Sequence, residues 1–117
     1  MGHAGPAGTL AVVSAFESML QLPPPRQLQI APGALVVRDL PAPDPSAPTV
    51  LLLHGWTSTA DLNWFRCYRP LNERFRVIAL DHRGHGNGVR TRRRFRLADC
   101  ADDAIAVLDA LGVTTPV

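Results

Sequence analysis

Residues 51–56 read Leu-Leu-Leu-His-Gly-Trp, and this stretch decides the fold. With Thr49 and Val50 before it, it forms a continuous apolar run that ends in a glycine turn. Continuous rather than alternating apolarity is typical of a strand buried on both faces, as in a parallel sheet. The run therefore predicts a central strand whose carboxyl end carries a loop.

A second apolar strand with a glycine-rich end follows. Residues 75–80 are Phe-Arg-Val-Ile-Ala-Leu and run into residues 81–86, which read Asp-His-Arg-Gly-His-Gly. The two glycines permit the positive φ of a tight turn. We expect Asp81 to accept hydrogen bonds from turn amides and Arg83 to pair with a carboxylate or with carbonyl oxygens.

The segments around these strands have helical character. Residues 60–73 follow three candidate N-caps, Thr57, Ser58 and Thr59, and carry a partly apolar stripe. Residues 98–111 repeat apolar side chains at helical spacing and precede Gly112, which suits a left-handed cap. The apolar positions are Ala101, Ala104, Ile105, Leu108 and Leu111.

Residues 114–117 look like the opening of another strand, so strands and helices alternate along the chain. That order implies right-handed β-α-β crossovers. The predicted fold class is α/β, a three-layer sandwich with a mainly parallel central sheet.

The N-terminal part is organised differently. We expect a short amphipathic helix over residues 10–21, an extended linker at the triple proline 23–25, and short strands over 28–30 and 34–37. Four prolines make residues 41–48 a loop. The predicted organisation is an N-terminal extension, 1–27, followed by an α/β domain, 28–117.

Together, the His-Gly-Trp and Asp-His-Arg-Gly-His-Gly segments resemble the α/β-hydrolase fold family. That family carries His-Gly-X after one strand and Asp-x-Arg-Gly-x-Gly after the next. The resemblance covers roughly residues 34–117 and corresponds to the N-terminal portion of the fold, ending before the nucleophile elbow.

The resemblance implies a role for each motif residue. The backbone N–H of Trp56 would be one donor of the oxyanion hole, and its indole would line the pocket. The other residues would be structural: His54, Gly55, Asp81, Arg83, Gly84 and Gly86. A full-length member would hydrolyse a small ester-like substrate through a serine nucleophile, although the fold also supports epoxide, halide and carbon–carbon bond cleavage.

The nucleophile segment itself is absent. No Gly-x-Ser-x-Gly occurs, and the four serines stand in helical or loop segments: Ser14, Ser18, Ser46 and Ser58. The acid and the base follow the nucleophile in this family. We therefore expect a truncated chain that is inactive alone, that acts on a small molecule only when completed by a C-terminal half, and that self-associates through its uncovered surfaces.

Two other functions compete with the hydrolase interpretation. The chain could be a non-catalytic α/β module that binds a partner through its unpaired sheet edge or the arginine loop, or a nucleic-acid-binding domain that uses the loop from Arg90 to Arg96. The loop has one aromatic residue, so base stacking is poorly supported. A metal site at His82 and His85 lacks further ligands, and no nucleotide-binding glycine motif occurs, so no cofactor is predicted.

The cellular compartment is inferred from cysteines and hydropathy. Cys67 and Cys100 are far apart in sequence and fit two reduced thiols. The apolar stretch 10–22 is too short and too polar to cross a bilayer, and no basic residue precedes it as in a signal peptide. We expect a cytoplasmic protein without a membrane partner.

Trp64, Phe65 and Tyr68 are expected in the core or, for one of them, beside the pocket.

Overall fold

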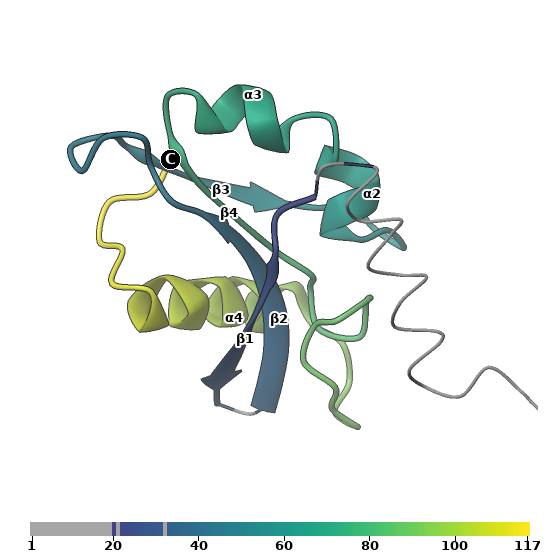
Figure 1. Cartoon of the computed structure of the whole chain (residues 1–117). Helices are drawn as coiled ribbons and strands as arrows, with labels where there is room; N and C mark the ends of the chain where they lie inside the picture. Colours follow the sequence, from purple (N-terminus) through teal and green to yellow (C-terminus); the bar gives the residue numbers. More distant parts are fainter. Residues whose placement is uncertain (1–19, 21, 32) are drawn as a thin grey trace, which may run out of the picture.

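A computed structural model describes residues 20, 22–31 and 33–117. Its four strands form one sheet in the order β1-β2-β4-β3 (Figure 1). The strands are β1 (Pro25–Ile30), β2 (Gly33–Leu40), β3 (Thr49–Leu53) and β4 (Arg76–Leu80). The helices are α2 (Ala60–Trp64), α3 (Tyr68–Asn72) and α4 (Leu97–Ala110). The helix expected over 10–21 lies outside the described residues except for Leu20, and the boundary between residues 27 and 28 stays a prediction.

The two strands that decide the fold are parallel neighbours. β3 pairs with β4 from Thr49 opposite Arg76 to Leu53 opposite Leu80. The carboxyl ends of both strands therefore meet at one edge of the sheet, which is the arrangement that the two motifs predict.

The rest of the sheet is antiparallel, so the described sheet is mixed. β1 and β2 form a hairpin, and β2 pairs antiparallel with β4. On the outer side of β3, Pro116 forms a parallel bridge with Thr49, and Val117 exchanges hydrogen bonds with Thr49 and Leu51. The chain thus begins a further parallel strand where the sequence predicts one.

Helices cover both faces of the sheet, which confirms the three layers (Figure 1). α4 lies on one face, and α2 and α3 lie on the other. The core on the α4 side consists of Leu35, Val37, Ile78, Leu80, Val89, Val107 and Leu108. The core on the other side consists of Leu40, Leu52, Ala60, Tyr68, Val77 and Ala79. β4 supplies alternate residues to both cores, as expected of a strand buried on both faces.

The single helix expected over 60–73 is wrong, because the segment forms two short helices. Thr59 caps α2 as expected, since its hydroxyl accepts from Leu62 N–H at 3.2 Å. A continuous helix would place the ring of Pro70 against the carbonyl of Arg66. The break after Trp64 instead leaves Pro70 in the first turn of α3, where proline is tolerated.

The triple proline and the apolar stripe of α4 also differ from expectation. Pro25 begins β1 rather than ending a linker; a proline is acceptable at the start of an edge strand. On α4 the buried face is Cys100, Asp103, Ala104, Val107 and Leu108. Ala101 and Ile105 are exposed, because Asp103 takes an inward position for its ion pair with Arg83.

Candidate functional site

The loop after β3 and the loop after β4 are joined by His54. Its Nε2 accepts the His82 backbone N–H at 2.8 Å, and its Nδ1 donates to the Gly55 carbonyl at 2.7 Å. The ring is buried, with 6% of its surface exposed. Both nitrogens are occupied by backbone groups, so this geometry gives His54 a structural contact rather than a free base.

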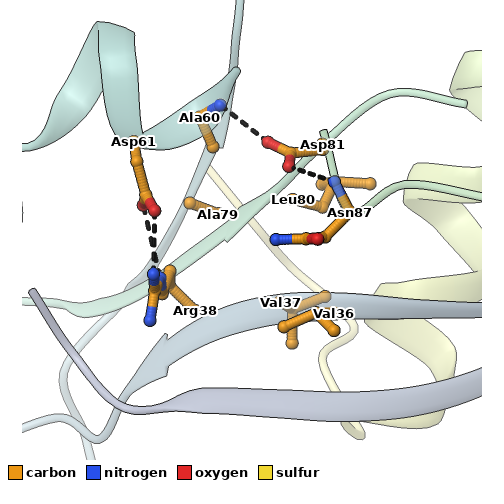
Figure 2. A pocket seen from close by; sticks show the side chains of 9 residues that line it. All are labelled: Val36, Val37, Arg38, Ala60, Asp61, Ala79, Leu80, Asp81 and Asn87. Atoms are coloured by element: carbon orange, nitrogen blue, oxygen red, sulfur yellow. Dashed lines mark hydrogen bonds and ion pairs between the residues drawn. The ribbon is translucent and has the colours of Figure 1, made fainter. Parts of the chain in front are cut away.

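Asp81 ties the second loop to the start of α2. Its Oδ1 accepts the Ala60 N–H at 2.7 Å and its Oδ2 accepts the Asn87 N–H at 2.8 Å (Figure 2). A carboxylate at a helix N-terminus satisfies an otherwise unpaired amide. The expected hydrogen bonds from backbone amides to the Asp81 carboxylate are therefore present, and one of them comes from another element, α2.

Arg83 forms the expected ion pair, with a residue on α4. Its guanidinium donates to both carboxylate oxygens of Asp103, at 2.9 and 2.7 Å, and lies 3.7 Å from Asp99. Both side chains of the Arg83–Asp103 pair are buried. The hydrogen bonds to Asp103 raise the pKa of Arg83 against the opposing effect of burial. Arg83 therefore fastens its loop to α4.

The loop requires glycine at positions 84 and 86 for different reasons. Gly84 and Gly86 both have positive φ, 75° and 43°. A Cβ at position 84 would meet nothing within 4 Å, whereas one at position 86 would lie 2.2 Å from Asp81 Oδ2. Gly84 is needed for its backbone conformation alone, and Gly86 also leaves room for the carboxylate.

Trp56 stands exposed at the carboxyl end of β3, beside the second loop. Its side chain is 69% exposed, and its ring centroid lies 5.6 Å from that of His85 and 5.0 Å from that of Phe95. Within the described residues, its backbone N–H donates no hydrogen bond. A rigid backbone donor that is not already used can stabilise a developing oxyanion.

The turn around Trp56 is held by Asn63, which the sequence analysis did not identify, and by His85, which it considered only as a metal ligand. Asn63 on α2 accepts the Gly55 N–H at 2.7 Å, and His85 Nε2 accepts the Thr57 N–H at 3.3 Å. Thr57 has a φ of 58°, which is rare for a β-branched residue. No local pattern in the sequence identifies these contacts, because each joins residues that are eight or more positions apart.

Among the described residues, the histidines of the two loops do not form a metal centre. His82 and His85 both lie near the His54 ring, at centroid distances of 4.5 and 5.2 Å. Across the described part of the chain, no group of three or more potential ligands is brought together. Burial and the neighbouring His54 lower the pKa of His82, whose buried Nδ1 has no hydrogen-bond partner among the described residues.

A small polar cavity lies beneath Asp81, between β2, β4 and α2 (Figure 2). It has a volume of about 20 Å³, enough for a single water molecule. Arg38 borders it and forms a two-pronged ion pair with Asp61, which also accepts the Tyr68 hydroxyl at 2.8 Å. The cavity is too small for an organic substrate, so it is not the substrate site. The residues that line it hold the loop after β4 in place.

The aromatic residues of the α2–α3 segment have distinct positions. Tyr68 is fully buried, and the indole N–H of Trp64 donates to the Leu53 carbonyl at 3.2 Å. Phe65 is partly buried and lies under the guanidinium of Arg66. The core prediction holds for Tyr68, and the hydrogen bond of Trp64 holds the last residue of β3.

The arginine-rich loop between β4 and α4 is exposed. All five arginines of the cluster lie at the surface: Arg90, Arg92, Arg93, Arg94 and Arg96. Arg90 donates to the Gly86 carbonyl, and Arg96 lies 3.5 Å from Asp99.

No helix within the described ranges has the length and apolar character needed to span a bilayer.

Known proteins resemble this chain in both sequence and structure. A family model described as the alpha/beta hydrolase fold matches residues 48–117. The 2-heptyl-3-hydroxy-4-quinolone dioxygenase of Rhodococcus erythropolis is 34% identical over 95 residues, which are 80% of this chain and 34% of that protein. The bifunctional esterase/perhydrolase of Acinetobacter calcoaceticus is 38% identical over 57% of this chain and 24% of that protein.

A solved structure shares the fold over nearly the whole chain. A bacterial membrane phospholipase A, described as a virulence factor, superposes with a TM-score of 0.74 and 29% identity, and the match covers 94% of this chain and 35% of that one. The chain thus spans about a third of the length of the proteins it matches, or less.

Proposed function

The chain belongs to the α/β-hydrolase fold family, and from this premise we propose that it supplies the oxyanion-stabilising loop of an enzyme that hydrolyses small ester-like substrates. The observation that carries the proposal is the position of Trp56. Its exposed turn lies at the carboxyl end of β3, and its amide is not engaged by any described residue. Open α/β sheets bind their ligands at this edge.

The chemistry assigned to the loop is electrostatic. When a nucleophile attacks an ester carbonyl, negative charge develops on the carbonyl oxygen, and a fixed N–H stabilises that charge. In our proposal, Trp56 N–H is one such donor. His54, Asp81 and Arg83 hold the surrounding loops in place but touch no reacting atom.

We further propose that the 117 residues do not turn over an ester by themselves. None of the four serines lies in a Gly-x-Ser-x-Gly segment, and a serine acts only with its acid and base partners in reach. With no nucleophile, an oxyanion donor has no covalent step to assist.

A chimera tests the oxyanion role. Residues 48–117 replace the matching segment of the Acinetobacter esterase/perhydrolase, and hydrolysis of p-nitrophenyl acetate is followed. W56F keeps the backbone N–H and should retain most of kcat, whereas W56P removes it and should lower kcat about 100- to 1,000-fold. Equal kcat values for two folded variants, checked by circular dichroism, would refute the role of Trp56.

A second candidate function is dioxygenation of a quinolone-like compound. One of the similar proteins is named as a quinolone dioxygenase, and the exposed ring of Trp56 packs with the half-buried rings of His85 and Phe95 at the same edge. Flat rings pack favourably on such side chains. Oxygen uptake by an equivalent chimera with the Rhodococcus protein, using its quinolone substrate, would favour this candidate over ester hydrolysis.

The proposed compartment is the cytoplasm. Cys67 and Cys100 are both free thiols, and burial raises the pKa of Cys100. Free thiols persist where the environment is reducing. Fractionation with a compartment marker tests this, and recovery in the periplasm would contradict it.

Self-association is the proposed behaviour of the isolated chain. Large apolar side chains are exposed on several elements: Leu53, Trp56, Leu62, Leu97, Ile105 and Val117. Exposed apolar surface promotes association. Gel filtration over a range of concentrations tests this, and a monomer at all concentrations would contradict it.

A further inference from the structure

The arginine-rich loop, residues 90–96, contacts the turn that carries Trp56 through an aromatic side chain. Phe95 lies between Arg94 and Arg96 in the chain, and its ring centroid is 5.0 Å from that of Trp56 and 6.0 Å from that of His85. Figure 1 shows the loop between β4 and α4 at the same edge of the sheet as the turn between β3 and α2, where the carboxyl ends of β3 and β4 lie. The loop is therefore a border of the proposed site rather than a distant surface.

This border has an unbalanced positive charge. Residues 82–96 contain six arginines and no acidic residue. Arg83 is neutralised by Asp103, and Arg96 is near Asp99. Within the described residues, no carboxylate lies in ion-pair contact with Arg92, Arg93 or Arg94, and all three are exposed.

Charge concentrated beside a binding site raises the local concentration of ligands of opposite charge. If three unit charges lie roughly 10 Å from the Trp56 ring, they attract an anion about four- to five-fold at ~0.01 M ionic strength and less than about two-fold at ~0.15 M. A solvated loop on the far side of the molecule would have no such effect at Trp56. The ring contact of Phe95 is what brings the charge to the site.

We propose that this site selects an anionic small-molecule substrate, whose negative group faces the arginine-rich loop while its reacting carbonyl lies at the Trp56 amide. The second part of this statement rests on the proposed function; the attraction of an anion to Trp56 does not. A carboxylate is the simplest such group, because guanidinium groups bind it with paired hydrogen bonds.

The test uses the 117-residue chain and the fluorescence of Trp56. W64F leaves Trp56 as the only tryptophan of the chain. W56F alone leaves only Trp64, and the quenching of Trp64 serves as the control for quenching that does not involve Trp56. Two quenchers with the same nitrophenyl ring are compared: 4-nitrobenzoate, which is anionic, and 4-nitrobenzamide, which is neutral. The ratio of their quenching constants, taken from lifetimes, reports the preference of the Trp56 surroundings for an anion.

Two variants with the same change in net charge are compared. R92Q/R93Q/R94Q removes charge from the loop, and R66Q/R69Q/R74Q removes it from exposed positions around α2 and α3. At ~0.01 M ionic strength we expect the loop variant to lower the anion preference about four- to five-fold, and the control variant to lower it by a smaller factor. Equal ratios in both variants would overturn the proposal.

The same experiment separates this inference from its rivals. No hydrolysis is measured, so an inactive chimera would refute the proposed function and leave the anion preference standing. A short single-stranded oligonucleotide that quenches Trp56 at micromolar concentration, and does so less as salt is added, would assign the loop to nucleic acid and overturn the proposal.

Discussion

Replacing Gly86 by alanine should damage the fold more than the same change at Gly84, although both glycines have positive φ. A Cβ at position 86 would lie 2.2 Å from Asp81 Oδ2 and 3.0 Å from Thr59 Cγ2. The carboxylate must then move, and its bonds to the Ala60 and Asn87 amides, 2.7 and 2.8 Å, cannot both survive.

The magnitude follows from two contributions. A left-handed backbone conformation costs an alanine about 1–2 kcal/mol. Loss of one charge-assisted hydrogen bond of Asp81 costs about 1.5–3 kcal/mol more. G86A should therefore lower the free energy of unfolding by about 2.5–5 kcal/mol, and G84A, whose Cβ meets no atom within 4 Å, by about 1–2 kcal/mol.

Urea denaturation followed by circular dichroism measures both variants. A double-mutant cycle with D81A isolates the contact, because without the carboxylate G86A should cost only its backbone strain. If G86A and G84A agree within about 0.5 kcal/mol, the close approach of Gly86 to Asp81 has no energetic weight and the reasoning fails.

D103A leaves a buried guanidinium without its partner, so we expect the free energy of unfolding to fall by about 3–5 kcal/mol, whereas D102A, at an exposed position of α4, should change it by less than about 0.5 kcal/mol. Urea denaturation compares them, and equal losses would contradict the importance of the pair. Burial and a neighbouring carboxylate raise the pKa of Tyr68, so the folded chain keeps a proton that the unfolded chain loses above about pH 10. Stability should be complete below that pH and fall as the pH rises, and urea midpoints should show no such additional slope in Y68F. H85F keeps an aromatic ring but lacks the acceptor for the Thr57 N–H, so amide exchange at Thr57 should rise about five-fold, the effect of a bond worth about 1 kcal/mol. H85Q, which can accept again, should restore protection, and unchanged exchange in H85F would exclude the contact.

The parallel pair and its two loops could be predicted because their signals are local. A continuous apolar run followed by a glycine turn identifies each strand and its carboxyl end. Asp81 and Arg83 have side chains that must find partners, and the structure provides them: Ala60, Asn87 and Asp103. Residue type indicated the kind of contact, and only the fold identified the partner.

Other features depend on contacts between distant residues. The antiparallel β2 separates β1 from β4, and no pattern within residues 33–40 specifies that neighbour. The break between α2 and α3 has a local cause in Pro70, which the apolar periodicity of residues 60–73 obscures. The buried face of α4 differs from the predicted apolar stripe because Asp103, a charged residue, is buried through its ion pair with Arg83.

Asp81 also has a mechanical consequence. Since one carboxylate is bonded both to the first residue of α2 and to the loop after β4, neither segment can shift without pulling on the other. We expect these two segments, which lie beside Trp56, to move together as one rigid unit. Residues 90–96, which have no regular secondary structure, are not held by this carboxylate.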